Sequence, residues 1–266
     1  MNMKALNSHT NLERFFGDFC LSKKRILFVD YDGTISATVK ERDKTIPYPG
    51  VNERIRVLSK SPQTRLIIIS GRCLSVLKQQ LNFENYPEMI GSHGLERYIP
   101  GKGETQIAID EVTKRGLKEA WHWAGQTGLG EYCEIKLAGL AFHWRGLSEC
   151  KANRIRDEVV GRWKNSAASN NLELHFFDGG IELRYSKMDK GQAVESILRE
   201  TGDRPIVAYL GDDQTDEEAF AALGDRGLKI LVREKLRPTR ADLQILPPKE
   251  LLTFLDLWIE ADNQQT

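Results

Sequence analysis

The sequence predicts an α/β fold in which a parallel, helix-covered sheet is interrupted by a smaller inserted α+β module. Two observations predict it. Short apolar runs alternate with amphipathic helical segments in the first and last parts of the chain. Residues 109–186 instead show a helix followed by two strands, twice over. We therefore expect a core domain of residues 1–104 and 187–266 and an inserted domain of residues 105–186.

The first part of the chain supplies helices and strands in alternation. The helices are amphipathic segments, expected at residues 11–20, 51–61 and 73–81. In the second of these, Val51, Ile55 and Leu58 recur at helical spacing on one side. The strands are short apolar runs bounded by turn residues, expected at 25–30, 64–70 and 88–94. This order is typical of a parallel sheet.

The middle of the chain has a different pattern. Two long helices are expected, at 109–126 and 147–168. The first is followed by two strands that meet near Gly139, and the second by strands at 172–177 and 181–186 around an Asp-Gly-Gly turn. Such a pattern favours a small antiparallel sheet with helices on one face.

The alternation of helices and strands returns after residue 188. Helices are expected at 190–201, 215–225 and 247–261, and strands at 205–213 and 227–233. Pro247 and Pro248 stand at the start of the closing helix, a position that tolerates proline. The last part of the chain thus completes the parallel sheet.

Composition excludes several classes of protein. The 266 residues carry 38 Lys plus Arg and 38 Asp plus Glu, so no net field attracts nucleic acid or an anionic membrane. The longest strongly apolar run, residues 66–69, is far shorter than the roughly 20 residues of a membrane span. Residues 1–16 lack the apolar core of a signal peptide, and the four cysteines show no C-x-x-C spacing. We expect a cytoplasmic monomer with free thiols.

Four polar motifs follow the predicted strands. They are DYDGT at 30–34, SGR at 70–72, Lys190 in MDKG, and GDDQTDEE at 211–218. Taken singly, a D-x-D is also common as a helix cap or turn, and SGR as a turn. Open α/β sheets bind ligands at the carboxyl ends of their strands, so the combination favours one shared site.

The residue types in these motifs suit phosphoryl transfer. A carboxylate can attack phosphorus and form an aspartyl phosphate, which splits hydrolysis into two easier displacements. A second acid then protonates the departing alkoxide and later deprotonates water. Asp30 suits the first role and Asp32 the second, while Gly33 lets the backbone turn its N–H groups toward the phosphate.

A phosphate beside carboxylates needs compensating positive charge. Mg²⁺ binds through a few carboxylates together with phosphate and water, and Asp30 and Asp212 can supply such ligands. The Ser70 hydroxyl and the Lys190 ammonium can hold phosphoryl oxygens and offset developing charge. We therefore expect Mg²⁺ as the cofactor and a phosphorylated small molecule as the substrate.

The order D-x-D-G-T, serine, lysine and G-D-D-x-x-D resembles the four motifs of the haloacid-dehalogenase phosphatase superfamily. The resemblance implies a Rossmann-like core and a C2-type cap between the serine and lysine motifs. It also implies Asp30 as nucleophile, Asp32 as acid and base, and Asp212 as a metal ligand, with the backbone carbonyl of Asp32 completing the metal site. For Asp213 and Asp216, metal ligation and structural support are both open.

A narrower resemblance is to trehalose-6-phosphate phosphatases. The most specific segments are GDDQTDEEAF and the E-x-K…H-x-R spacing, supported by LFVDYDGT, IISGR, GSHGLE and IELRYSKMDKG. One departure is Tyr185, where the family usually has proline after arginine. The resemblance implies a phosphoric monoester hydrolase that acts on a sugar phosphate.

The inserted module carries three polar pairs at strand spacing, and residues two apart share one face of a strand. The pairs are Glu134 with Lys136, His143 with Arg145, and Glu182 with Arg184. A solvated outer face is the alternative for any single pair, but three pairs favour a lining that binds sugar hydroxyls. The resemblance implies that Glu134, Lys136 and Glu182 contact the distal glucose.

Four further residues are expected to contact the substrate: Gly71, Arg72, His93 and Arg145. Two other roles are open for Arg72, pairing with a site carboxylate or capping its loop. A purely structural role is open for His93.

We expect Mg²⁺-dependent hydrolysis of trehalose 6-phosphate to trehalose and phosphate. The alternatives are another glycosyl phosphate, such as mannosyl- or glucosyl-3-phosphoglycerate or sucrose phosphate, a phosphomutase, and a non-catalytic sugar-phosphate sensor. The presence of both Asp30 and Asp32 argues against the sensor.

Overall fold

The computed structural model of the chain describes residues 3–8, 10–37, 45–177, 179–202 and 204–264. The chain divides into two compact units. The first unit, the core unit, contains Met1–Gln106 and Asp189–Thr266, and the second, the inserted unit, contains Ile107–Met188. Each unit is described by itself below.

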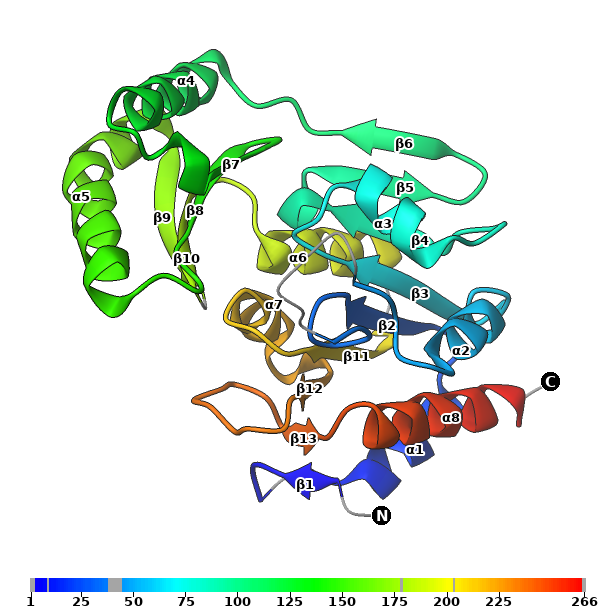
Figure 1. Cartoon of the computed structure of the whole chain (residues 1–266). Helices are drawn as coiled ribbons and strands as arrows, with labels where there is room; N and C mark the ends of the chain where they lie inside the picture. Colours follow the sequence, from blue (N-terminus) through cyan, green and yellow to red (C-terminus); the bar gives the residue numbers. More distant parts are fainter. Residues whose placement is uncertain (1–2, 9, 38–44, 178, 203, 265–266) are drawn as a thin grey trace. The chain divides into compact units, whose positions relative to one another are not determined.

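In the described part of the core unit, one sheet with nine strands forms the centre (Figure 1). Its strands are β1 (Lys4–Ala5), β2 (Arg25–Asp30), β3 (Thr64–Ile69), β4 (Glu88–Gly91), β5 (Glu96–Ile99), β6 (Gly103–Gln106), β11 (Ile206–Gly211), β12 (Leu228–Val232) and β13 (Leu243–Ile245). Their order is β1-β13-β12-β11-β2-β3-β4-β5-β6. Every neighbouring pair from β13 to β4 is parallel, while β1, β5 and β6 are antiparallel to their neighbours.

Helices cover both faces of this sheet. They are α1 (Leu12–Leu21), α2 (Val51–Leu58), α3 (Leu74–Leu81), α6 (Lys190–Thr201), α7 (Asp216–Leu223) and α8 (Lys249–Asn263). In β2, Leu27 and Val29 pack into the hydrophobic cluster with α1, α2, α3 and α8, whereas Ile26 and Phe28 pack into the cluster with α6 and α7. Because successive side chains of a strand point to opposite faces, burial of both faces requires a continuous apolar run. The predicted α/β class is confirmed.

Several predicted elements differ from the structure. The strand expected at 88–94 ends at Gly91, since Ser92 and His93 adopt positive φ of 49° and 56° in a short 3₁₀ turn. The closing helix begins at Lys249, with Pro248 as its N-cap. The edge strands β1 and β6 and the strands next to them, β13 and β5, were not predicted, because all four are short and β6 is exposed and polar.

The described residues of the inserted unit form a four-stranded antiparallel sheet with two α-helices. Its elements are β7 (Cys133–Lys136), β8 (Gly139–His143), β9 (Leu172–Phe177), β10 (Gly180–Tyr185), α4 (Glu111–Gln126) and α5 (Glu149–Ala167). The strand order is β7-β8-β10-β9. Phe142, Ile181 and Leu183 form a buried cluster with Trp163 of α5. The predicted helix-strand-strand repetition is therefore present.

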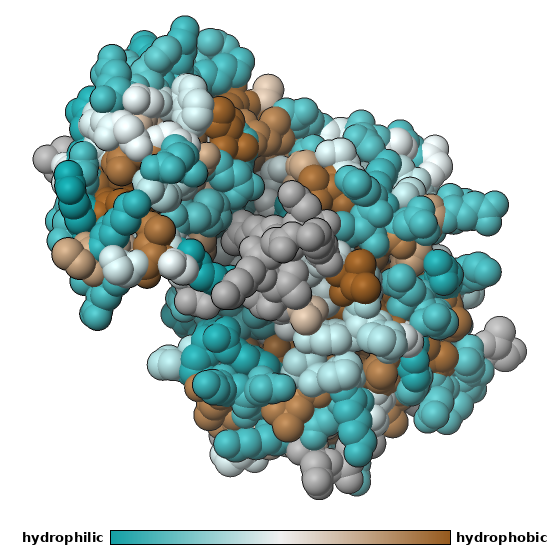
Figure 2. Space-filling view, in the orientation of Figure 1, coloured by the Kyte–Doolittle hydropathy of each residue, from teal (hydrophilic) through white to brown (hydrophobic). Residues whose placement is uncertain are grey.

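The visible surface is mainly hydrophilic, with small separate hydrophobic areas (Figure 2). Among the described residues, every helix is too short or too polar to cross a membrane. The described thiols Cys73, Cys133 and Cys150 are free.

Candidate active site

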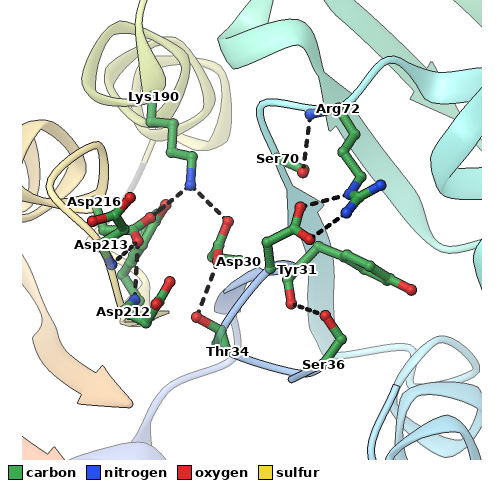
Figure 3. Close-up of polar contacts among 12 residues, drawn as sticks. Asp30, Tyr31, Thr34, Ser36, Ser70, Arg72, Lys190, Asp212, Asp213 and Asp216 are labelled. Carbon is green, nitrogen blue, oxygen red and sulfur yellow. Dashed lines mark hydrogen bonds and ion pairs between the residues drawn. The ribbon is translucent and has the colours of Figure 1, made fainter. Parts of the chain in front are cut away.

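Three neighbouring strands of the core unit end at polar residues. Asp30 is the last residue of β2, Ser70 follows β3, and Asp212 follows β11. Since β2 lies between β3 and β11 and all three are parallel, these residues share the carboxyl edge of the sheet (Figure 3). This edge is where open α/β sheets bind ligands.

Lys190 brings a buried positive charge to this edge. It is the first residue of α6, which begins there because the Asp189 side chain accepts a hydrogen bond from the N–H of Gln192. Its Nζ lies 2.6 Å from Asp30 Oδ1 and 2.8 Å from Asp216 Oδ1 (Figure 3). Burial by itself lowers the pKa of Lys190, but the charges of Asp216 and Asp30 outweigh burial and raise it. The ammonium is therefore a fixed cation.

Asp30 is a buried carboxyl group with two side-chain partners. Oδ1 accepts from Lys190, and Oδ2 accepts from the Thr34 hydroxyl at 3.0 Å. Burial raises the pKa of Asp30 to about 8, against the lowering effect of Lys190 and with a further increase from Asp216. Burial thus disfavours the ionised form of Asp30, and additional positive charge beside it would favour that form.

Asp216 organises the loop that follows β11. Its Oδ1 accepts from Lys190 and from the Tyr209 hydroxyl at 2.7 Å. Its Oδ2 accepts from the backbone N–H groups of Asp212 and Asp213, each at 3.0 Å. These contacts occupy both oxygens, which favours support over metal ligation for this residue.

Three carboxylates lie close enough to hold a metal ion. Oxygens of Asp30, Asp212 and Asp216 lie within 4.8 Å of one another. Asp212 Oδ1 is buried and has no hydrogen-bond partner among the described residues. Burial, followed by the charge of Asp30, raises the pKa of Asp212 well above its usual range. A buried, unpartnered carboxylate oxygen in an all-oxygen cluster fits a hard divalent cation.

Gly33 allows the Asp212 carboxylate to approach the D-x-D-G-T loop. It has a φ of 81°, and a Cβ at this position would lie 2.1 Å from Asp212 Oδ2. Glycine is therefore required both by the backbone conformation and by the close approach.

Asp32 pairs with a different cation from Asp30. Its two oxygens accept from Arg72 Nε and Nη2, each at 2.6 Å, and Arg72 Nη2 also donates to Thr45 Oγ1 at 2.7 Å. The Asp32 side chain is 39% exposed, so it is accessible to a substrate. Of the roles left open for Arg72, pairing with a site carboxylate is the one observed.

The loop of Ser70 is held by the strained turn after β4. Ser70 Oγ accepts from the N–H of Arg72 at 3.1 Å, and the N–H of His93 donates to Ser70 O at 3.0 Å. The His93 ring lies against Gly71, where a Cβ would be 2.5 Å from Nε2. The close approach explains why glycine follows Ser70.

Two residues of the site were missed by the sequence analysis. Thr34 belongs to the D-x-D-G-T motif but received no role, and it donates to Asp30. Tyr209 lies within β11 and donates to Asp216. Strand position gave no signal for Tyr209, because an aromatic residue in an apolar strand is the usual pattern of a core.

In the inserted unit, the polar side chains gather on the sheet face opposite the helices. Strand register pairs both Glu134 and Glu182 with Ala141, so the two carboxylates share this face. Lys136 Nζ lies 2.8 Å from Glu182 Oε2, and His143 Nε2 lies 2.7 Å from Glu134 Oε2. Arg145 follows β8 and lies against Gly179. The Lys136–Glu182 pair is the more buried of the two, with side chains 19% and 6% exposed.

Known proteins resemble the chain in both sequence and fold. The family model described as trehalose-phosphatase matches residues 28–245. The probable trehalose-phosphate phosphatase E of Arabidopsis thaliana is 29% identical over 265 residues, covering 90% of this chain and 71% of that protein.

Two solved structures share the fold. The C. albicans trehalose-6-phosphate phosphatase C-terminal domain has a TM-score of 0.79 at 22% identity, covering 98% of this chain and 99% of that chain. A haloacid dehalogenase-like hydrolase from B. subtilis has a TM-score of 0.62 at 13% identity, with 88% and 99% coverage.

Proposed function

Because the chain belongs to the trehalose-phosphatase family, we propose that it hydrolyses trehalose 6-phosphate to trehalose and inorganic phosphate. The observation that carries the proposal is the buried Lys190 between Asp30 and Asp216, with Asp212 beside them. This arrangement supplies a nucleophile, a fixed cation and an oxygen cluster at the carboxyl edge of one sheet.

In the first step, an oxygen of Asp30 attacks the phosphorus, and the bond between phosphorus and the sugar oxygen breaks. Asp32 gives its proton to that oxygen, so that trehalose leaves as a neutral alcohol. In the second step, Asp32 takes a proton from water, whose oxygen attacks the aspartyl phosphate and releases Asp30. Arg72 donates to both oxygens of Asp32 in the structure, so one of these two contacts must open whenever Asp32 carries the proton.

Ser70 and Lys190 bind the phosphoryl oxygens and offset charge that develops on them. Gly71, Arg72 and His93 contact the same end of the substrate. Asp30, Asp212 and the backbone carbonyl of Asp32 would hold Mg²⁺, which when bound supplies positive charge that ionises the carboxylates and polarises the phosphoryl group. The buried, unpartnered Asp212 Oδ1 supports this assignment.

The sugar end of the substrate is assigned to the polar face of the inserted unit, through Glu134, Lys136, Arg145 and Glu182. Charged side chains on one sheet face can donate to and accept from many hydroxyls, and an analogue that lacks those hydroxyls leaves them unpaired. We also propose a cytoplasmic location, which the free thiols Cys73, Cys133 and Cys150 support.

Phosphate release from a panel of glycosyl phosphates tests the function. The panel contains trehalose 6-phosphate, sucrose 6-phosphate, and mannosyl- and glucosyl-3-phosphoglycerate, each with Mg²⁺. We expect the largest kcat/KM for trehalose 6-phosphate. Equal or better turnover of a phosphoglycerate ester would exclude the trehalose assignment, and absence of turnover throughout would favour a sensor.

A further inference from the structure

The segment after β12 forms hydrogen bonds with the loop that carries Asp212. The guanidinium of Arg237 donates from Nε to the backbone oxygen of Asp212 at 3.1 Å and from Nη2 to that of Asp213 at 2.7 Å. Its Nη1 lies 2.5 Å from Glu217 Oε1 in the first turn of α7 and 2.8 Å from the backbone oxygen of Pro238. One planar side chain therefore contacts two residues of the loop between β11 and α7 and one residue in the first turn of α7.

Glu217 accepts further hydrogen bonds from the segment that carries Arg237. Its Oε1 also accepts from the Thr239 hydroxyl, and its Oε2 accepts from the N–H of Arg240, both at 2.8 Å. The side chains of Arg237 and Glu217 are only 16% and 12% exposed, so solvent screens the pair weakly. We call this group of Arg237, Glu217 and Thr239 the clasp.

The clasp and Asp216 both bind the backbone of Asp212 and Asp213, Asp216 at the N–H groups and Arg237 at the carbonyl oxygens. Arg233 adds a longer contact of 3.4 Å to the carbonyl of Asp212. The backbone that aims the unpartnered Asp212 carboxylate is thereby fixed at both its donors and its acceptors.

We propose that Arg237, through the clasp, is a positioning residue for Asp212 and sets the affinity of the site for a divalent cation. The inference rests on the proposed function, which gives Asp212 its role as a metal ligand. Partners that orient a metal ligand change metal affinity typically by about 10–100-fold when they are removed. Arginine suits the role because its planar fork reaches two carbonyls and a carboxylate at once, which the single ammonium of lysine does not do.

Isothermal titration calorimetry with Mg²⁺ tests the proposal on the whole chain and on variants shown to be folded by circular dichroism. We expect Arg237→Ala to raise the dissociation constant for Mg²⁺ by about 10–100-fold, and Arg237→Lys to give a smaller increase. The control is Arg226→Ala, which removes an arginine paired with Glu195 and the Ala222 carbonyl elsewhere in the core unit and leaves Mg²⁺ affinity unchanged.

Steady-state kinetics give a second readout. In Arg237→Ala the Mg²⁺ concentration for half-maximal activity rises by the same factor, while KM for trehalose 6-phosphate and kcat at saturating Mg²⁺ stay within about twofold, because the clasp acts through the metal ligand. A general loss of packing would instead lower kcat at every Mg²⁺ concentration.

A folded Arg237→Ala variant with the Mg²⁺ affinity of the unaltered chain would overturn the proposal, as would an equal loss in Arg226→Ala. If Arg237→Ala does not fold, Glu217→Gln decides: weakened Mg²⁺ binding supports the clasp, and unchanged binding refutes it. Mg²⁺ binding that depends on Arg237 in a protein without sugar-phosphatase activity would support the clasp and refute the proposed function.

Discussion

Asp30 and Asp32 stand two residues apart at the end of β2, yet their surroundings differ. Asp30 is buried against Lys190, whereas the partly exposed Asp32 is paired with Arg72. Two carboxyl groups in such different environments can take different roles at one pH. The separation of the pair onto two cations explains how a strand can end on neighbouring carboxylates.

Replacement of the nucleophile tests the covalent mechanism. We expect Asp30→Asn to lower the rate of phosphate release by about 10⁴-fold or more, because a neutral amide is a much poorer nucleophile than a carboxylate. Rapid mixing followed by acid quenching measures the phosphorylated protein, which should be absent in the variant. Activity that survives this substitution unchanged would exclude an aspartyl phosphate on Asp30.

The close approach of Gly33 to Asp212 can be tested separately from the backbone strain that a substitution at Gly33 introduces. A Cβ at Gly33 overlaps the Asp212 carboxylate, so we expect Gly33→Ala to displace Asp212 and lower kcat/KM by about 100-fold. Gly101→Ala is the matched control, since Gly101 has a similar φ of 77° but no atom within 4 Å of the added Cβ. Both variants carry the backbone strain, and only Gly33→Ala should lose activity. An equal loss in both would attribute the effect to strain.

At the scale of elements, α8 is tied to the sheet through a buried ion pair. Arg25 of β2 donates to Asp262 of α8 at 2.7 Å and to Gln63 at 2.7 Å, and its guanidinium lies over the ring of Phe19. Thr64 donates to Asp262 and accepts from Trp258, which joins β3 to the same helix. A second ion pair to α8, Arg54 with Asp256, is more exposed.

We expect the loss of these two ion pairs to lower the free energy of unfolding by different amounts. Arg25→Met leaves Asp262 without its cation in a buried place, so we expect the free energy of unfolding to fall by about 3–5 kcal/mol. Arg54→Met removes a solvent-screened pair and should cost roughly 0–1 kcal/mol. Urea unfolding followed by circular dichroism measures both. Similar losses in the two variants would show that burial does not determine the strength of these contacts.

At the scale of the whole molecule, each of the two units has its own proposed role. The core unit carries the carboxylates and Lys190, and the inserted unit carries the charged sheet face with the Lys136–Glu182 pair. A substrate without the sugar should therefore depend on the core unit alone.

That division can be measured with two substrates. We expect Lys136→Ala to lower kcat/KM for trehalose 6-phosphate by about 10–100-fold, the effect of losing a charged hydrogen bond, and to leave hydrolysis of p-nitrophenyl phosphate unchanged. Lys114→Ala is the control, because Lys114 pairs with Glu111 on an exposed surface of the same unit. Equal losses with both substrates would place Lys136 in folding or chemistry instead of sugar binding.

The order of the principal elements was predictable from the sequence because its signals are local. The central part of a strand buried on both faces must be apolar, as in 26–29 and 66–69, and a helix must repeat its apolar residues at its own period. The D-x-D-G-T and G-D-D motifs are equally local, so the reaction class followed from short segments. An edge strand such as β6 lacks an apolar pattern of its own. It is polar and exposed, and it forms because its backbone pairs with that of β5.

The sequence by itself determined the α/β class, the inserted module and the residue types available for phosphoryl transfer. Only the tertiary structure decided which of these residues meet. Lys190 reaches Asp30 across 160 positions of sequence, Arg72 reaches Asp32 across 40, and Arg237 reaches Glu217 across 20. Hydrogen bonds of less than 3 Å depend on where the backbone of separate elements is fixed in space, and no periodicity within one element encodes that position.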